Sequence, residues 1–274
     1  MALIYDVSFD SQTRILSLLD KSGNSISSCE VPSKSKSKEL TLTATEDNSS
    51  VALKKVGDVN NTYEYKLNNG DWTSYTLTTS GVVIPLSAGD KIQWRCTNRP
   101  TTFSVMVYVQ FVMTGKIEAS NPVTSMVLYT LDPSSLYGYD FACCRLFSDC
   151  SALIKAPELP ATILATGCYG GMFYACNSLT RAPALPATTL VEHCYSAKLA
   201  AIFTTFFGMF SNCSNLKEIR CAATNPSANS LYEWLQNVST TGDFWCDPNV
   251  TWKTGISGSP SGWTRHDIAD YPNQ

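Results

Sequence analysis

The residues best suited to chemistry in this chain are its eleven cysteines and its two histidines, His193 and His266. A nucleophilic cysteine needs a base within hydrogen-bond reach, and a zinc site needs Cys and His ligands clustered at short spacings. The chain has no Cys-x-x-Cys pair, and its cysteines are spread from Cys29 to Cys246. His193 directly precedes Cys194, but on an extended segment neighbouring side chains point to opposite faces. We therefore predict no catalytic residue, no metal site and no cofactor.

The carboxylates give no clearer catalytic pattern. Asp140 and Asp149 are separated by the block Phe141–Phe147 and have no recognisable partner. The G-x-G-x-x-G, P-loop and G-x-S-x-G motifs are absent from the sequence. A polysaccharide-degrading enzyme needs two carboxyl groups that face each other, which two domains could still bring together. We expect a protein that is not an enzyme, with a glycan-processing enzyme as the least favoured alternative.

The spacing of the cysteines instead indicates a repeat. Three blocks share the order apolar residue, Phe, two variable residues, Cys, two variable residues, Leu: "LFSDCSAL" (146–153), "MFYACNSL" (172–179) and "MFSNCSNL" (209–216). Because one turn of a solenoid cannot bury its own apolar face, equivalent residues stack on their neighbours, and a small hydrophobe suits a tight corner. The predicted ladders are Phe147, Phe173 and Phe210; Cys150, Cys176 and Cys213; and Leu153, Leu179 and Leu216.

A proline-containing segment follows each of the first two blocks. It reads A-P-x-L-P-A-T at Ala156–Thr162 and again, one repeat later, at Ala182–Thr188. Proline blocks regular helix and ladder pairing, so each segment is predicted to be a short strand that leads into an extended corner.

The third copy carries an insertion, because the interval from Cys194 to Phe210 is much longer than the equivalent interval from Cys168 to Phe173. The inserted residues include a single charge and the candidate interface residues Ile202, Phe203, Phe206 and Phe207. They form either a loop folded back over the repeats or an apolar projection that packs against another protein. We favour the projection, since three turns offer little surface to cover so many aromatics.

The elements that must position these residues are predicted to be mainly β. Residues 1–32 alternate as a three-strand meander too small to bury a core, so they are expected to dock on something else. The tract "SKSKSK" has linker composition, and the alternating strands after it indicate an antiparallel β-sandwich. The predicted division is 1–32 meander, 33–38 linker, 39–132 β-sandwich, 133–230 repeats and 231–274 closing cap.

Composition limits the partners. Of the 274 residues 16% are charged and the net charge is -3, which gives no electrostatic footprint for nucleic acid. No run reaches the roughly 18 apolar residues of a spanning helix, so membrane insertion is not expected. The start "MALIYDVSFDSQ" lacks the pattern of a secretory signal, which favours synthesis in the cytoplasm.

The unit "CYxxMFxxCxSLxxAPxLPATTL" resembles the BspA-like leucine-rich repeats encoded by gut Bacteroidota and by their crAss-like phages. The resemblance covers Phe141 to about Cys221. The tail Leu231–Asp267 looks like the segment that closes such repeats, and "YKLNNGDWTSYTL" is similar to the β-sandwich that often precedes them. The chain differs from long arrays in having barely three copies, near the minimum for a stable solenoid.

The resemblance implies a structural and adhesive role, without catalysis. We expect a component of a bacteriophage virion, in a fibre at the capsid surface or the tail; the alternative is an adhesin on the bacterial cell surface. The expected partners are further copies of the chain, for example in a trimer, other virion proteins through the N-terminal segment, and a host-surface glycan. Aromatic residues suit sugar stacking, although core packing is the more common role: Tyr169, Tyr174, Tyr195, Trp234 and Trp245.

Overall fold

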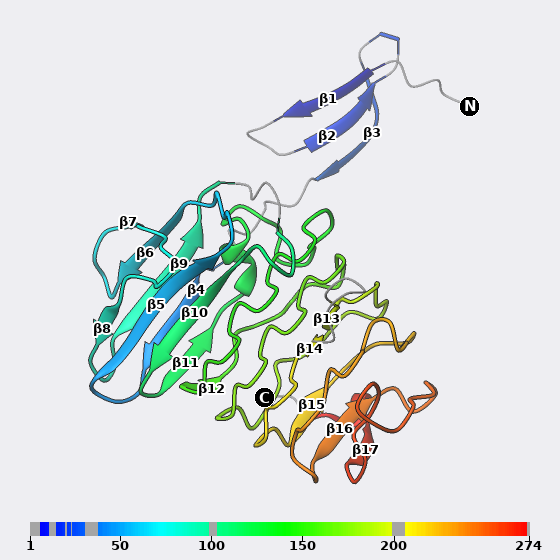
Figure 1. Cartoon of the computed structure of the whole chain (residues 1–274). Helices are drawn as coiled ribbons and strands as arrows, with labels where there is room; N and C mark the ends of the chain where they lie inside the picture. The colour runs from blue at the N-terminus through cyan, green and yellow to red at the C-terminus, as the bar shows by residue number, and fades with distance from the viewer. Residues whose placement is uncertain are drawn as a thin grey trace. The chain divides into compact units, whose positions relative to one another are not determined.

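The computed structural model describes residues 6–10, 15–19, 21–22, 24–30, 38–98, 103–198 and 206–272. The chain divides into two compact units, Met1–Lys36 and Ser37–Gln274 (Figure 1). Within the described ranges the regular structure is strands and two 3-10 helices, η1 (Val123–Met126) and η2 (Ile268–Asp270). The prediction of a mainly β chain is confirmed.

The first unit contains one antiparallel sheet of three strands in the order β1-β2-β3. These are β1 (Asp6–Asp10), β2 (Ile15–Leu19) and β3 (Ser25–Glu30). Of the predicted linker, only Lys38 lies among the described residues.

The second unit begins with two sheets, one of order β10-β5-β8 and one of order β12-β11-β4-β9-β6-β7. Trp94 of β9 and Phe111 of β10 meet edge to face with ring centroids 5.5 Å apart, so the two sheets share an aromatic core. The strands are β4 (Leu40–Ala44), β5 (Ser49–Val56), β6 (Tyr63–Leu67), β7 (Thr73–Tyr75), β8 (Ile84–Leu86), β9 (Lys91–Cys96), β10 (Tyr108–Thr114), β11 (Ile117–Ser120) and β12 (Leu153–Lys155).

The core of the sheets continues into the repeats. Strand β12 belongs to the first repeat, yet it pairs in parallel with β11 through Ile117 and Leu153. Phe111 also donates its backbone N–H to Leu146 O at 2.8 Å. The predicted boundary between residues 132 and 133 therefore lies within the second unit.

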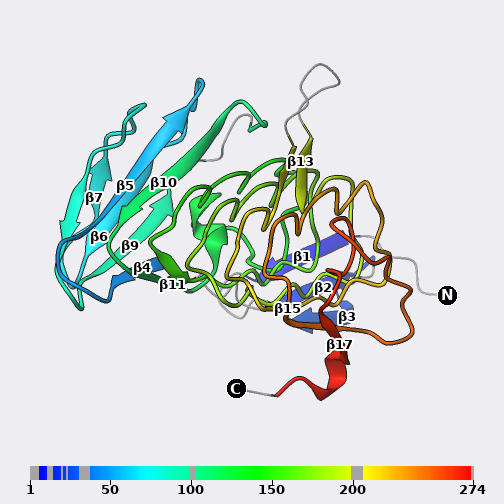
Figure 2. The same ribbon diagram turned by 60° about the horizontal axis from the view of Figure 1, so that its bottom comes forward.

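The repeats form successive turns of chain, which we call coils: 141–166, 167–192 and 193–228. Alternate residues donate their N–H groups to the next coil, as in Cys143 N to Cys168 O (2.9 Å). The residues between them bond within their own coil, as in Cys144 N to Phe141 O (3.0 Å). Figure 2 shows the coils following one another toward the C-terminal strands. This alternation gives the buried amides of the coils hydrogen-bond partners without a regular helix or strand.

Left-handed backbone recurs at equivalent positions of the coils. Phe141, Gly167 and His193 begin successive coils and have φ values of 55°, 62° and 56°. The expectation of an extended segment at His193 and Cys194 was wrong, because the chain turns there. The rule that neighbouring side chains on an extended segment point to opposite faces therefore does not apply to His193 and Cys194.

Candidate functional site

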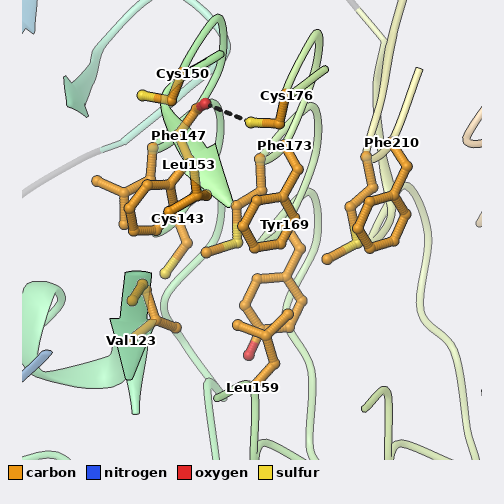
Figure 3. Close-up of a cluster of buried hydrophobic side chains, with 14 of the residues drawn as sticks. Val123, Cys143, Phe147, Cys150, Leu153, Leu159, Tyr169, Phe173, Cys176 and Phe210 are labelled. Atoms are coloured by element: carbon orange, nitrogen blue, oxygen red, sulfur yellow. Dashed lines mark hydrogen bonds between the residues drawn. The ribbon is translucent and has the colours of Figure 1, made fainter. Parts of the chain in front are cut away.

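The structure brings the predicted phenylalanine ladder together. The rings of Phe147 and Phe173 stack at 5.7 Å and 11°, and those of Phe173 and Phe210 at 5.4 Å and 7° (Figure 3). The column extends beyond the repeats, because Phe111 stacks on Phe147 at 5.2 Å and Trp234 lies 6.3 Å from Phe210. The leucines at the end of each block are fully buried: Leu153, Leu179 and Leu216.

The predicted cysteine ladder carries hydrogen bonds that the sequence did not reveal. Each thiol donates to the carbonyl oxygen of the preceding phenylalanine in the aromatic column, which for Cys150 is Phe111 of β10. Figure 3 draws the bond from Cys176 Sγ to Phe147 O. The distances are 3.2 Å for Cys150 to Phe111, 3.0 Å for Cys176 to Phe147 and 2.9 Å for Cys213 to Phe173. Cysteine is thus both a small hydrophobe and a weak donor at this corner.

A second set of buried cysteines accompanies the first. Cys143 donates its N–H to Cys168 O, and Cys168 Sγ lies 4.0 Å from Cys194 O. Cys194, Cys221 and Cys246 continue the set toward the cap. Besides burial, the nearby Cys221 thiol raises the pKa of Cys194, and the nearby Cys246 thiol raises the pKa of Cys221. The signal was present in the sequence as Cys168 and Cys194, which begin the second and third copies.

These thiols are poor nucleophiles. Burial raises the pKa of Cys144, Cys194, Cys213 and Cys221 to about 12. Since the thiolate is the reactive species, such cysteines are inert at neutral pH. Within the described ranges, no three His, Cys, Asp or Glu side chains are grouped so as to hold a metal ion.

Polar and charged side chains gather instead on the outer face of the C-terminal parallel strands β15 (Glu218–Arg220), β16 (Asp243–Cys246) and β17 (Thr264–Asp267). Ile219 and Phe244 point into the core, so their neighbours along the strands point outward. The strand registers place these neighbours in two rows: Glu218, Asp243 and Thr264; and Arg220, Trp245 and His266.

Tyr271 links the first strand of this face to the second. Its hydroxyl donates to Glu218 Oε1 at 2.5 Å, and Arg181 Nε lies 2.9 Å from the same oxygen. The guanidinium of Arg220 lies 4.7 Å from the centre of the Tyr271 ring, and Trp245 meets that ring edge-on at 5.1 Å. Burial and the hydrogen bond to Glu218 raise the pKa of Tyr271. The tyrosine therefore stays neutral and holds the cluster together.

His266 and Asp243 form the closest approach to catalytic geometry. His266 Nε2 is 2.7 Å from Asp243 Oδ1, and the imidazole stacks on Trp245 at 4.3 Å and 22°. A triad also needs a nucleophile on the histidine. The contacts of His266 in the described part of the chain include no hydroxyl and no thiol. The pair thus orients a surface histidine.

Next to this face lies a groove of about 670 Å³, lined by the two proline-containing segments, Arg181, Arg220 and Tyr271. It follows a gap in the pairing of the coils. Residues 153–160 bond to the 117–123 segment, and residues 180–188 bond to the 217–224 segment. No backbone hydrogen bond joins 153–160 to 180–188, all of which are described. We call this gap the seam.

The two ends of the insertion in the third coil pair with each other as short strands. Strands β13 (Ser196–Lys198) and β14 (Phe206–Gly208) are antiparallel neighbours (Figure 1). Met209 N donates to Tyr195 O at 2.9 Å. A side chain at Gly208 would collide with the Glu233 carbonyl, so the hairpin base requires glycine. Of the candidate interface, Ile202 and Phe203 lie outside the described residues, and Phe206 and Phe207 are described by their backbone alone.

The aromatic residues considered for sugar stacking divide into two groups. Tyr169, Tyr195 and Trp234 are buried and stack on one another at 6.3 and 5.8 Å, so they belong to the core. Tyr174 and Trp245 are half-buried. Sequence reasoning missed Arg181, Glu218, Arg220 and Tyr271, because no motif connects these distant positions.

Within the described residues, no helix has both the length and the apolar character needed to cross a bilayer. Comparison with models of protein families, with curated proteins and with solved structures gives no match for this chain.

Proposed function

We propose that this chain is a non-enzymatic structural and adhesive component of a bacteriophage particle, in a fibre at the capsid surface or the tail. In this proposal the three coils are a short leucine-rich-repeat solenoid of the BspA-like type. The closing segment and the preceding sheets cap its two ends.

The observation that carries the proposal is that the residues most capable of chemistry serve packing. The repeat cysteines donate to the backbone carbonyl of the preceding phenylalanine in the aromatic column, and burial holds their thiols protonated. The groups left at the surface are suited to binding: a charged face, a groove and a hairpin. In this scaffold the reactive groups are buried in the core and the surface is suited to binding. This arrangement fits an adhesive protein better than an enzyme.

The proposal assigns a partner to the N-terminal sheet and to the hairpin. The N-terminal three-stranded sheet docks on another virion protein, since three short strands cannot bury a core by themselves. The hairpin between Tyr195 and Met209 packs against further copies of the chain, for example in a trimer. The two ends of the insertion pair as β13 and β14, and Met209 N donates to Tyr195 O, so the insertion leaves the third coil at a hydrogen-bonded base.

Replacing Phe203, Phe206 and Phe207 together with serine is expected to convert the oligomer to a monomer, because it removes the apolar contact area. Multi-angle light scattering measures the mass, and circular dichroism checks the fold. The matched control replaces Val82 and Val83 with serine, which are 46% and 63% exposed on the loop before β8, and should leave the mass unchanged. A monomeric unmodified chain, or an oligomer that survives the triple change, would contradict the assembly role.

A further inference from the structure

The groove along the seam has the dimensions and the chemistry of a ligand site. Its volume of about 670 Å³ falls within the roughly 300–1,000 Å³ typical of small-molecule sites. We propose that it binds a carboxylate-bearing saccharide, such as a uronic or sialic acid within a surface glycan. This inference rests on the adhesive function proposed above and names the ligand class for one of its surfaces.

The positive charge of the groove favours the binding of an anion. Its lining includes Lys155, Arg181 and Arg220 against one carboxylate, Glu158, on a chain whose net charge is -3. Lys155 and Arg220 have no carboxylate partner among the described residues, and Arg181 engages Glu218 through Nε. The terminal nitrogens of Arg181 remain available for a planar carboxylate, which a guanidinium binds through paired hydrogen bonds.

The backbone along the seam favours a ligand rich in hydroxyl groups. Pro157, Pro160, Pro183 and Pro186 line the groove and have no N–H, whereas their carbonyl oxygens remain acceptors. No backbone bond crosses the seam, so carbonyls along it have no partner on the opposite coil. Sugar hydroxyls donate to such carbonyls, and the apolar faces of sugar rings match the proline and alanine side chains.

An extended acidic peptide fits the groove less well. A peptide that adds to a sheet edge needs alternating donors and acceptors along that edge. The prolines remove two N–H donors from each side of the seam, so a regular ladder of alternating donors and acceptors is interrupted on both sides. The seam is thus rich in acceptors and cations, as an acidic saccharide requires.

The test measures binding by calorimetry to a galacturonic acid trisaccharide and to sialyllactose, with a galactose trisaccharide as the neutral control. The unmodified chain should bind at least one acidic sugar more tightly than the neutral one. Lys155→Gln and Arg220→Gln should each weaken that binding by about tenfold, since each removes a charge-assisted contact. Lys253→Gln, an exposed lysine of the cap, should bind as the unmodified chain does.

Thermal unfolding of each variant establishes that it is folded. The inference is overturned if neither acidic sugar binds, if the neutral sugar binds equally well, or if a glutamate-rich peptide binds more tightly than both acidic sugars. Loss of sugar binding in a chain that is still found in phage particles would remove this inference alone. Sugar binding by a chain absent from particles would remove the virion assignment alone.

Discussion

Phe173→Ala is expected to lower the free energy of unfolding by about 3–5 kcal/mol, the usual cost of removing a buried phenylalanine. Phe173 is fully buried and lies at the middle of the aromatic column, with a stacked ring on either side. Truncation removes both ring contacts and leaves a cavity between coils that are fixed by backbone hydrogen bonds. Urea denaturation followed by fluorescence and circular dichroism measures the change.

The matched control is Tyr137→Ala, a similar truncation at a side chain that is 80% exposed. It should change stability by no more than about 0.5 kcal/mol. Phe173→Leu should lose less than Phe173→Ala, because it fills part of the cavity. An alanine variant as stable as the Tyr137 control would show that the column does not hold the coils together.

The second large effect is a loss of stability in alkaline solution. In the unfolded chain the thiols ionise near pH 9, whereas burial raises the pKa of Cys144, Cys194, Cys213 and Cys221 to about 12 in the fold. Below pH 9 both states hold the protons, and this contribution to stability is fully present. Above pH 9 the unfolded state releases protons that the folded state retains, so stability falls until the folded thiols ionise near pH 12.

Above pH 9, each such thiol lowers the free energy of unfolding by up to about 1.4 kcal/mol per pH unit, and the contributions of several thiols add. Because total stabilities are only about 5–15 kcal/mol, the chain should unfold within about two pH units above pH 9. Denaturant titrations at pH 8 to 10.5 under a reducing agent provide the slope.

A chain with alanine at Cys150, Cys176 and Cys213 serves as the control for the alkaline effect. Its absolute stability is lower, but its slope above pH 9 should be shallower by up to about 4 kcal/mol per pH unit, since three thiols no longer titrate. The same slope in both chains would mean that these thiols are not protected from solvent in the fold.

The sequence predicted the contacts between equivalent residues of successive coils, because the repeat period determines them. Phe147 and Phe173 are separated by the same interval as Cys150 and Cys176, and stacking follows because equivalent residues of successive coils meet. The insertion did not disturb this order, since the hairpin closes on itself before the third phenylalanine. The period also placed Cys168 and Cys194 in a common register.

The groove and the charged face could not be predicted in the same way. Glu218 and Tyr271 are far apart in the sequence, and Arg181 meets Glu218 across the insertion, so no spacing rule connects them. The seam arises because residues 153–160 pair with the 117–123 segment, whereas residues 180–188 pair with the 217–224 segment. Since the proline-containing segments of the first two coils are alike in sequence, the sequence did not predict that they have different partners. The continuity of the β-sheets with the repeats was also hidden, because it rests on the pairing of Ile117 with Leu153. Periodicity reports burial along the chain, and it does not report the neighbours of irregular segments.

The most direct test of the proposed virion assignment is a mass-spectrometric inventory of purified phage particles, prepared from lysed cells whose phage genome carries the gene for this chain. Peptides of this chain should be present in the purified particles in a fixed ratio to the major capsid protein. Cross-linking should join its N-terminal segment to another virion protein. Peptides recovered from the cell envelope or the lysate, and absent from the particles, would contradict the account.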